Sequence, residues 1–467
     1  MILKYLGLIL GIIVVFLVLY TVVGLIKTIY LKNKEVKLLT LPNDNSDRTT
    51  LYGNELFELI KVSSPATSND ESFHIIREKI KTIFPLIHNN FYREKIDQNV
   101  IYTYKNFQSD KPNVLFVSHI DNLIFNNDAI MTNNEIYGAG TFDAKALLYV
   151  ICKAVEEVLD EQGKLDVNLT IVITTDDTST KHGSEKIAKK LLKEGKFFHL
   201  VMEEGIGIVD PDYLGLKSNY ALIGIGVTGE VEIRFKKPLS EKHVLLEFLQ
   251  DVKNNRLFKT KINRQIIQIL KELSKDMDFK NRFYINNILL FKHKVQKSLD
   301  SGDIKVSRIV KTNVKYGLVQ ENEKEVYFDM KFELAPLTMP SEVLEVLAPY
   351  IEKYNLDYEI IFVNGGSRIT NVNQPGYKCV VETINKIFKH LYISPFIITN
   401  IAEKRFFDSV SDCVIRFSPL YYPSNILKDN YHGKEHIQKK SLLYGVDFFK
   451  TILKEFKVEV KSALSKM

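Results

Sequence analysis

The fold is decided by VLFVSHIDNLIFNNDAIMTNNEIYGAGTFDAK, residues 114–145. This stretch opens with an apolar run of β-branched and aromatic residues (114–117), which predicts a buried strand. The strand delivers His119 and Asp121 at its carboxyl end, and a later glycine-rich turn delivers Asp143 at the start of a helix. An imidazole and a carboxylate at a strand end, followed by a carboxylate on a loop, are typical of metal sites in α/β proteins. The stretch therefore predicts an α/β fold with a metal site at the carboxyl ends of its strands.

Three further segments carry residue types that bind zinc. They are the strand-like run 169–177 with Asp176 and Asp177, the run 198–205 with Glu203 and Glu204, and the polar loop around His432. Alone, each of these patterns is weak. An Asp-Asp pair after a strand is more often a turn or a helix cap, and a histidine before a helix is more often a surface residue. Their joint order along the chain is far more specific.

With these residues in this order, the chain resembles the M20 family of di-zinc peptidases and amidohydrolases, particularly the branch of carboxypeptidase S and the N-acyl amino acid hydrolases. The family pattern is His-x-Asp, Gly-x-Gly-x-x-Asp-x-Lys, Glu-Glu, Asp/Glu-Glu-Gly and His-Gly-x-x-Glu. The matching segments are residues 119–121, 138–145, 176–177, 203–205 and 432–435. Residues 55–65 and the segment RFSP at 416–419 also match, so the resemblance extends over residues 50–460.

The resemblance implies a site with two zinc ions, which need a bridging carboxylate and further ligands on each metal. By position, the ligands are Asp143 as the bridge, His119 and Glu203 for one ion, and Asp177 and His432 for the other. Asp121 would accept the other ring N–H of His119 and fix its tautomer. Asp176 stands where the family has its general base, which takes a proton from the attacking water. Arg405 would bind a carboxylate of the substrate.

Three segments depart from the family pattern. The Glu-Glu pair is replaced by Asp176 and Asp177, whose side chains are shorter by one C–C bond of about 1.5 Å. Misplacement of about 1 Å at a reacting centre can cost about 10²-fold in rate. The family's Gly-Gly-His segment corresponds to RFKKPLSEKH at 234–243, with no histidine in register, and its Thr-Asp-Ser-Arg-His segment to residues 402–406, which keep only the acid and Arg405.

Three functions are compatible with these residues. The first, which we expect, is an active zinc-dependent hydrolase that cleaves a peptide or N-acyl amide bond next to a free carboxylate. The second is a catalytically impaired pseudoenzyme of the same fold that acts as a binding or scaffold protein. The third is an unrelated membrane protein in which the motif order is a coincidence. Nucleotide binding is not favoured, because Gly138 and Gly140 lack the third glycine of the dinucleotide motif and a Walker lysine.

The N-terminal segment predicts a membrane anchor. Residues 5–26 contain no charge and suffice to cross about 30 Å of hydrocarbon as a helix. A cleaved signal peptide has a shorter apolar region and a small-x-small site after it, and a buried core helix would need a covering surface that the sequence does not identify. Lys27, Lys32, Lys34 and Lys37 favour a cytoplasmic body by the positive-inside rule. The family's anchored eukaryotic members face the other way, so the orientation stays open.

The order of elements divides the chain into five segments. Residues 1–27 form the anchor and residues 28–50 a basic, turn-rich linker. Residues 51–233 alternate strands and helices, which indicates βαβ units and a mainly parallel sheet in the first part of a metal-binding catalytic domain. Residues 234–346 combine helices with two strand-like runs, an inserted α+β lid domain that in many family members also dimerises. Residues 347–460 return to the first domain through the run EIIFVNGG.

Composition limits the partners. The net charge of +6 over 467 residues is mild and the lysines are scattered, so nucleic-acid binding is not predicted. Three cysteines (Cys152, Cys379 and Cys413) without a Cys-x-x-Cys pair argue against a disulfide framework and a thiolate zinc site. The expected partners are two zinc ions, a small peptide or N-acyl amino acid, the lipid membrane and a second copy of the chain.

Overall fold

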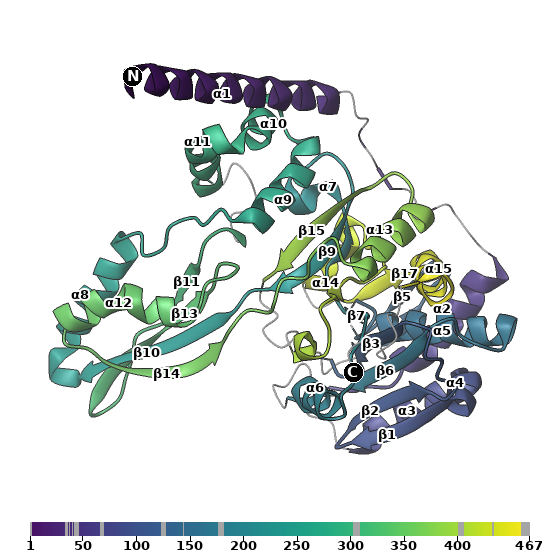
Figure 1. The fold of residues 1–467 in the computed structure, drawn as a ribbon. Helices are drawn as coiled ribbons and strands as arrows, with labels where there is room; N and C mark the ends of the chain where they lie inside the picture. Colours follow the sequence, from purple (N-terminus) through teal and green to yellow (C-terminus); the bar gives the residue numbers. More distant parts are fainter. Residues whose placement is uncertain are drawn as a thin grey trace, which may run out of the picture. The chain divides into compact units, whose positions relative to one another are not determined.

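The structure, a computed structural model, describes residues 2–32, 36, 38–39, 41, 46–65, 70–122, 128–142, 144–175, 182–301, 309–399, 406–431 and 434–458. The chain forms two compact units, whose elements are labelled in Figure 1. Unit 1 consists of Met1–Leu38, Pro211–Ser218 and Gly229–Asn364. Unit 2 consists of Leu39–Asp210, Asn219–Thr228 and Gly365–Met467.

Unit 2 is built on a nine-stranded sheet. Its order is β1 (Phe91–Ile96), β2 (Asn99–Tyr104), β6 (Asn168–Thr174), β3 (Asn113–His119), β7 (Leu200–Glu203), β16 (Val414–Arg416), β9 (Tyr220–Val227) and β15 (Tyr392–Ile398), with β8 (Gly207–Val209) paired to β9. β3 runs parallel to β6 and β7, β7 is parallel to β16, and β9 is parallel to β15. β1 and β2 form an antiparallel margin, and β9 is also antiparallel to β16 and β8. The predicted α/β fold with a large, mainly parallel sheet is confirmed.

Helices cover both faces of this sheet, which explains why its central strands are apolar along their whole length. Leu115 and Val117 of β3 share a core cluster with Ile187 of α6 (Gly183–Lys193). Phe116 points to the opposite face, because side chains alternate along a strand, and contacts Phe449 of α15 (Lys439–Glu455) with ring centroids 5.0 Å apart. The other helical elements of unit 2 are α2 (Asp47–Ile60), α3 (Asp70–Ile83), α4 (Pro85–Asn90), α5 (Lys145–Gln162), α13 (Pro375–Ile387), η4 (Phe406–Ser409) and α14 (Ser424–Tyr431).

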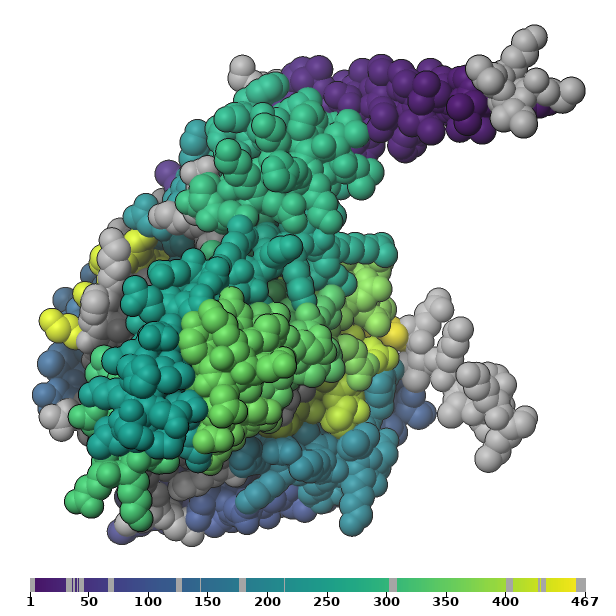
Figure 2. All heavy atoms as spheres, turned by 90° about the vertical axis from the view of Figure 1, so that its left-hand side faces the viewer, coloured from purple at the N-terminus to yellow at the C-terminus, as the bar shows by residue number. Residues whose placement is uncertain are grey.

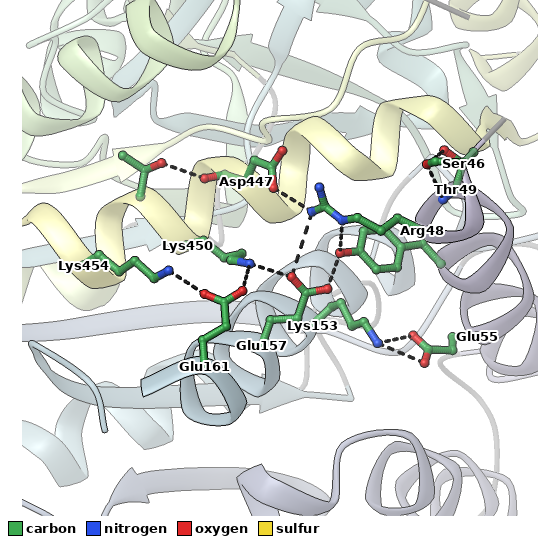
Figure 3. Close-up of polar contacts among 12 residues, drawn as sticks. Ser46, Arg48, Thr49, Glu55, Lys153, Glu157, Glu161, Asp447, Lys450 and Lys454 are labelled. Atoms are coloured by element: carbon green, nitrogen blue, oxygen red, sulfur yellow. Dashed lines mark hydrogen bonds and ion pairs between the residues drawn. The ribbon is translucent and has the colours of Figure 1, made fainter. Parts of the chain in front are cut away.

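An ion-pair network joins α2, α5 and α15 (Figure 3). Arg48 Nη2 lies 2.7 Å from Asp447 Oδ1 and 3.9 Å from Glu157 Oε2. Lys450 Nζ lies 2.7 Å from Glu157 Oε2 and 2.5 Å from Glu161 Oε1. Single exposed pairs contribute little, but a network that spans three helices fixes their relative positions. The position of α2 matters because the chain that follows it pairs beside the candidate site.

Unit 1 contains a five-stranded sheet in the order β11 (Asn313–Tyr316), β13 (Glu325–Glu333), β10 (Glu230–Pro238) and β14 (Asp357–Asn364), with β12 (Gln320–Glu321) paired to β13. Residues alternate between buried and half-exposed along β10 and β13. The buried set, including Phe235 and Phe328, packs against Phe248 of α8 (Lys242–Asn254) and Leu347 of α12 (Ser341–Lys353). This agrees with the expected helices over an antiparallel sheet.

The sheet of unit 1 extends farther along the sequence than expected. The run beginning at residue 359 was expected to lead back into the first domain. Instead β14 pairs antiparallel with β10, from Glu230 opposite Asn364 to Lys236 opposite Asp357. The inserted segment therefore spans Gly229–Asn364, compared with the expected 234–346.

Helix α1 (Ile2–Lys32) also belongs to unit 1. Its stretch Tyr5–Tyr30 is long and apolar enough to cross a membrane, and 6% of its most apolar 18-residue segment is buried. Figure 2 shows the purple helix covered at one end by teal-green side chains and bare along the rest of its visible face. The element that contacts α1 is α10 (Phe279–Asn286), which itself packs with α9 (Arg264–Leu273), η2 (Ser274–Asp276) and α11 (Ile288–Asp300).

Candidate metal and catalytic site

His119, the last residue of β3, lies between two carboxylates. Its Nδ1 is 3.1 Å from Asp121 Oδ1, and its Nε2 is 3.0 Å from Glu204 Oε2. The side chains of His119 and Asp121 are 4% and 0% exposed, and that of Glu204 is 18% exposed. A histidine that binds a metal commonly donates one ring N–H to a carboxylate, which fixes its tautomer and leaves the other nitrogen for the metal.

The neighbouring Glu203 points elsewhere. It is the last residue of β7 and pairs in register with Arg416 of β16. Its Oε2 lies 3.1 Å from Arg416 Nε, and Arg416 Nη2 lies 3.3 Å from Asp408 Oδ1. Burial raises the pKa of Asp408, although the charge of Arg416 opposes the shift. Because consecutive residues of an extended chain point to opposite faces, the contact of Glu203 with Arg416 directs Glu204 toward His119.

A glycine at position 205 allows this strand end to lie against β16. A Cβ atom there would stand 2.1 Å from the carbonyl oxygen of Arg416. The amide of Gly205 donates to Ser418 Oγ at 3.2 Å, and the amide of Phe417 donates to the carbonyl of Glu203 at 2.9 Å. The two strands therefore hold the Glu203-Glu204 pair in a fixed orientation.

The glycine-rich loop before Asp143 is held by Glu435. The Glu435 carboxylate accepts hydrogen bonds from the amides of Gly140 at 2.7 Å and Phe142 at 3.3 Å, and its carbonyl accepts one from Gly138 at 3.0 Å. Strand β17 (His436–Gln438) then pairs with β5 (Glu135–Tyr137), which in turn pairs with β4 (Ile130–Met131). The loop that follows α14 is thus joined to the loop that precedes α5.

Lys145 is fully buried at the start of α5. Its Nζ donates to the carbonyl of Val62 at 2.6 Å, and desolvation lowers its pKa to about 7 against the opposing effect of Glu435. Gly140, with φ of +95°, makes room for this side chain, because a Cβ there would stand 2.8 Å from Lys145 Cδ. Two matched segments of the sequence, 138–145 and 55–65, therefore meet through one buried lysine.

Five predicted site residues lie outside the described part of the chain, namely Asp143, Asp176, Asp177, Arg405 and His432. Within the described ranges, no group of three or more His, Cys, Asp or Glu side chains is arranged to hold a metal ion. Thr174, which shortly precedes Asp176 and Asp177 in the sequence, lies at the end of β6 and pairs in register with His119. The complete ligand set therefore stays a prediction.

Of the predicted residues that are described, His119 and Asp121 lie 3.1 Å apart and Glu203 lies 3.1 Å from Arg416, so the role of Glu203 as a ligand stays a prediction. The sequence offered Glu204 only as a candidate beside Glu203, and gave no role to Glu435 or Arg416. All three stood in segments that match the family pattern, but a motif does not show which side chain faces which neighbour. The segment 234–243 covers part of β10 and the start of α8, and His243 is exposed there in unit 1.

Residues 115–455 match the sequence description of peptidase family M20/M25/M40. The chain belongs to this family. N-fatty-acyl-amino acid synthase/hydrolase PM20D1 of Xenopus tropicalis is 23% identical over 334 residues, which cover 67% of this chain and 65% of that protein. The protein of the same name from Bos taurus is 20% identical over 392 residues, 77% of each chain.

Solved structures show the same fold at low identity. The M20 family metallo-carboxypeptidase Sso-CP2 from Sulfolobus solfataricus is 17% identical, with a TM-score of 0.57 over 87% of this chain and 99% of that one. Human carnosine dipeptidase 1 is 11% identical, with a TM-score of 0.56 over 88% and 97%. The predicted family, fold and enzyme class, a peptidase or amidohydrolase of the M20 type, are confirmed, and the coincidence alternative is excluded.

Proposed function

We propose that this M20 protein is a membrane-anchored, zinc-dependent hydrolase of amide bonds in small peptides or N-acyl amino acids. The observation that carries the proposal is the buried His119, set between Asp121 and Glu204 at the carboxyl end of a parallel strand. Proteins similar to this chain are named as an N-fatty-acyl-amino acid synthase/hydrolase and as a carnosine dipeptidase. Both names describe chemistry at an amide bond beside an amino acid.

The donor set suits zinc. An imidazole nitrogen and a carboxylate oxygen, His119 Nε2 and Glu204 Oε2, face one another, and both are zinc ligands of ordinary type. We assign Glu204 to the ligand position for which the sequence favoured Glu203, because the carboxylate of Glu203 is engaged by the buried Arg416. The further ligands proposed for two ions are Asp143, Asp177 and His432. When bound, the metals would polarise the amide carbonyl and make a water molecule more acidic.

The protein's own groups would orient the substrate and move the proton. Asp121 would accept the Nδ1–H of His119, which leaves the lone pair of Nε2 available to a metal ion. Asp176 would accept a proton from the attacking water and pass it to the leaving amine. Arg405 would bind the free carboxylate of the substrate through paired N–H donors. Glu435 holds the loop that presents Asp143.

The domain roles follow from the two units. Unit 2 is the proposed catalytic domain and the segment Gly229–Asn364 the proposed lid. Within the lid, β14 ends the sheet order, and its residues Ile360, Ile361, Phe362 and Val363 are 36–54% exposed. An exposed apolar edge strand is a template for pairing with another chain. This supports a homodimer formed through the lid.

The anchor is proposed as a single membrane-spanning helix that is kept in the mature protein, with either orientation. The supporting contact is between α1 and α10, where Arg282 Nη1 donates to the Thr28 carbonyl at 3.3 Å and Asn286 Nδ2 donates to Thr28 Oγ1 at 3.0 Å. A signal peptide that is removed would have no need of side chains fitted to its end. The lipid bilayer would then be a partner of residues 5–26.

The test is to purify the full chain in detergent, load it with zinc, and measure bound metal together with hydrolysis of dipeptides and N-acyl amino acids. Metal binding with hydrolysis of one of these classes is expected. Glu204→Gln should reduce both, and Asp176→Asn should reduce hydrolysis alone. Two bound zinc ions without hydrolysis of any substrate would favour the pseudoenzyme, and no bound metal would contradict the proposal.

A further inference from the structure

Three short helices of unit 1 lie outside its sheet-and-helix core. They are α9, α10 and α11, which occupy the chain between α8 and β11. Their own core is small: Ile266, Ile269 and Leu270 of α9, Ile285 of α10, and Val295 and Leu299 of α11 are buried. Figure 1 shows α10 and α11 next to α1 and away from the strands β10, β11 and β13. The segment therefore needs a role other than covering the sheet.

The contact with α1 sets where this segment lies along the apolar helix. Thr28 is completely buried and is bonded by Arg282 and Asn286 of α10. One turn earlier, the backbone of Gly24 lies so close to Asn287 that a Cβ atom would stand 2.1 Å from its Oδ1. Both positions lie near the carboxyl end of the apolar stretch Tyr5–Tyr30. An anchor of this length leaves the hydrocarbon layer near that end, which is also where polar contacts of arginine and asparagine are tolerated.

Apolar side chains beside this contact are exposed. Leu289 and Leu290 come after the buried Ile288 and are 70% and 40% exposed, and Phe279 at the start of α10 is 49% exposed. Phe279 also stacks on Phe283 of the same helix, with ring centroids 6.4 Å apart. Leucine and phenylalanine at the level where a helix leaves the bilayer are placed to enter the boundary between headgroups and acyl chains.

Basic side chains accompany these apolar ones. Lys292, Lys294 and Lys297 of α11 are exposed. By helical spacing, Lys294 and Lys297 lie away from the buried Val295 and Leu299, whereas Lys292 lies at the margin of their side. Lysine can lay its methylene stem on apolar surface while its ammonium group stays in water, and it attracts anionic headgroups. Apolar residues next to a lysine cluster, at the end of an anchor, match the chemistry of an anionic membrane surface.

We propose that α10 and α11 form a second membrane contact, in which Phe279, Leu289 and Leu290 enter the lipid interface and the lysines of α11 bind anionic headgroups. The inference rests on the proposed membrane anchorage of α1. Together the two contacts would hold unit 1 against the bilayer at two places, where a single helix followed by a free linker would leave it mobile. A lipid-facing lid segment would also suit a substrate with an acyl chain.

The absence of tryptophan from the sequence makes a direct test simple. Single tryptophans are introduced into the full chain as Leu289→Trp, Phe16→Trp and Leu318→Trp, and each protein is reconstituted in vesicles of phosphatidylcholine and phosphatidylserine with or without brominated acyl chains. Phe16 reports on the anchor itself. Leu318, 84% exposed in the turn between β11 and β12, is the matched control. Leu290→Trp repeats the measurement at a second position of α11.

Brominated lipid should quench the Leu289→Trp and Phe16→Trp proteins and leave Leu318→Trp unchanged. Adding Lys292→Gln, Lys294→Gln and Lys297→Gln to Leu289→Trp should weaken its quenching in anionic vesicles. Quenching of Phe16→Trp without quenching of either Leu289→Trp or Leu290→Trp would overturn the inference and leave the anchor standing. If Phe16→Trp is not quenched, the anchor fails and the inference fails with it. Shielded Leu289→Trp emission that brominated lipid does not quench would mean that protein covers the site, which also overturns it.

Discussion

Replacing Glu203 by glutamine should mainly lower the stability of the fold, whereas replacing Glu204 by glutamine should mainly lower the affinity for zinc. Glu203 is 4% exposed and faces the fully buried Arg416 at 3.1 Å. Removing one partner of a buried ion pair costs about 3–5 kcal/mol, because the other charge stays buried. Asp408 remains 3.3 Å from Arg416, so we expect the lower end of that range, about 3 kcal/mol, for Glu203→Gln.

Glu204→Gln should leave the fold nearly intact. Its side chain is 18% exposed at the edge of the sheet, and glutamine keeps its size, so the change in unfolding free energy should stay within about 1 kcal/mol. Losing a residue that only hydrogen-bonds to a metal ligand lowers metal affinity by roughly 10- to 100-fold. Glu204 is proposed as a ligand itself, so its loss should lower zinc affinity by more than that. In Glu203→Gln the affinity should fall less than in Glu204→Gln.

Two assays separate these effects. Urea unfolding of the chelator-treated full chain in detergent measures stability without any contribution from metal, and competition with a zinc indicator measures affinity. The two variants differ by one position and the same chemistry, so each is the control for the other. A stable Glu203→Gln protein with weak zinc binding, together with a normal Glu204→Gln protein, would refute the orientation argued for this pair.

Four further outcomes are expected. Asp176→Asn should abolish hydrolysis with nearly unchanged zinc content, and Asp176→Glu should raise the rate; full activity in the asparagine variant would remove Asp176 as the base. Burial lowers the pKa of His88 below the ordinary histidine value of about 6.5. Keeping His88 neutral therefore costs no stability above that pH, and the folded state is destabilised relative to the unfolded chain as the pH falls below it. His88→Gln should therefore flatten the acid side of the unfolding profile, and an unchanged slope would speak against this. Ile361→Lys on β14 should shift the chain toward monomer in light scattering, whereas Leu318→Lys should not. A chain beginning at residue 45 should be soluble without detergent, and recovery of the full chain in the same fraction would count against the anchor.

Local patterns predicted the centre of unit 2 well. The apolar run after residue 113 became β3, and the helix expected to follow Asp143 is α5, which begins at Lys145. Hydrophobic period and turn residues are properties of neighbouring positions, so a single sequence contains them. His119 and Asp121 followed from the same reasoning, since a strand end fixes both side chains within a few residues.

Contacts between distant segments were not readable in this way. Choosing between Glu203 and Glu204 requires knowing that Arg416 stands opposite the first of them, which depends on the pairing of β7 with β16. The run in β14 was misplaced for a similar reason. Its apolar residues look like those of a buried strand, yet all of them are exposed, and only the final Asn364 is buried. Whether an apolar run is central or at an edge is decided by its partners.

The residues that keep the family pattern and those that depart from it lie in different structural contexts. His119 and Glu204 stand at the ends of paired strands, where register fixes each side chain, and a substitution there would disturb the sheet as well as the site. The segment 234–243, which lacks the family's histidine, belongs to the inserted unit. Connections and inserted units change at low cost to the fold, and they determine which substrates are bound. The positions of His119 and Glu204 are therefore constrained by the fold, whereas the inserted segment can change with less effect on the sheet of unit 2.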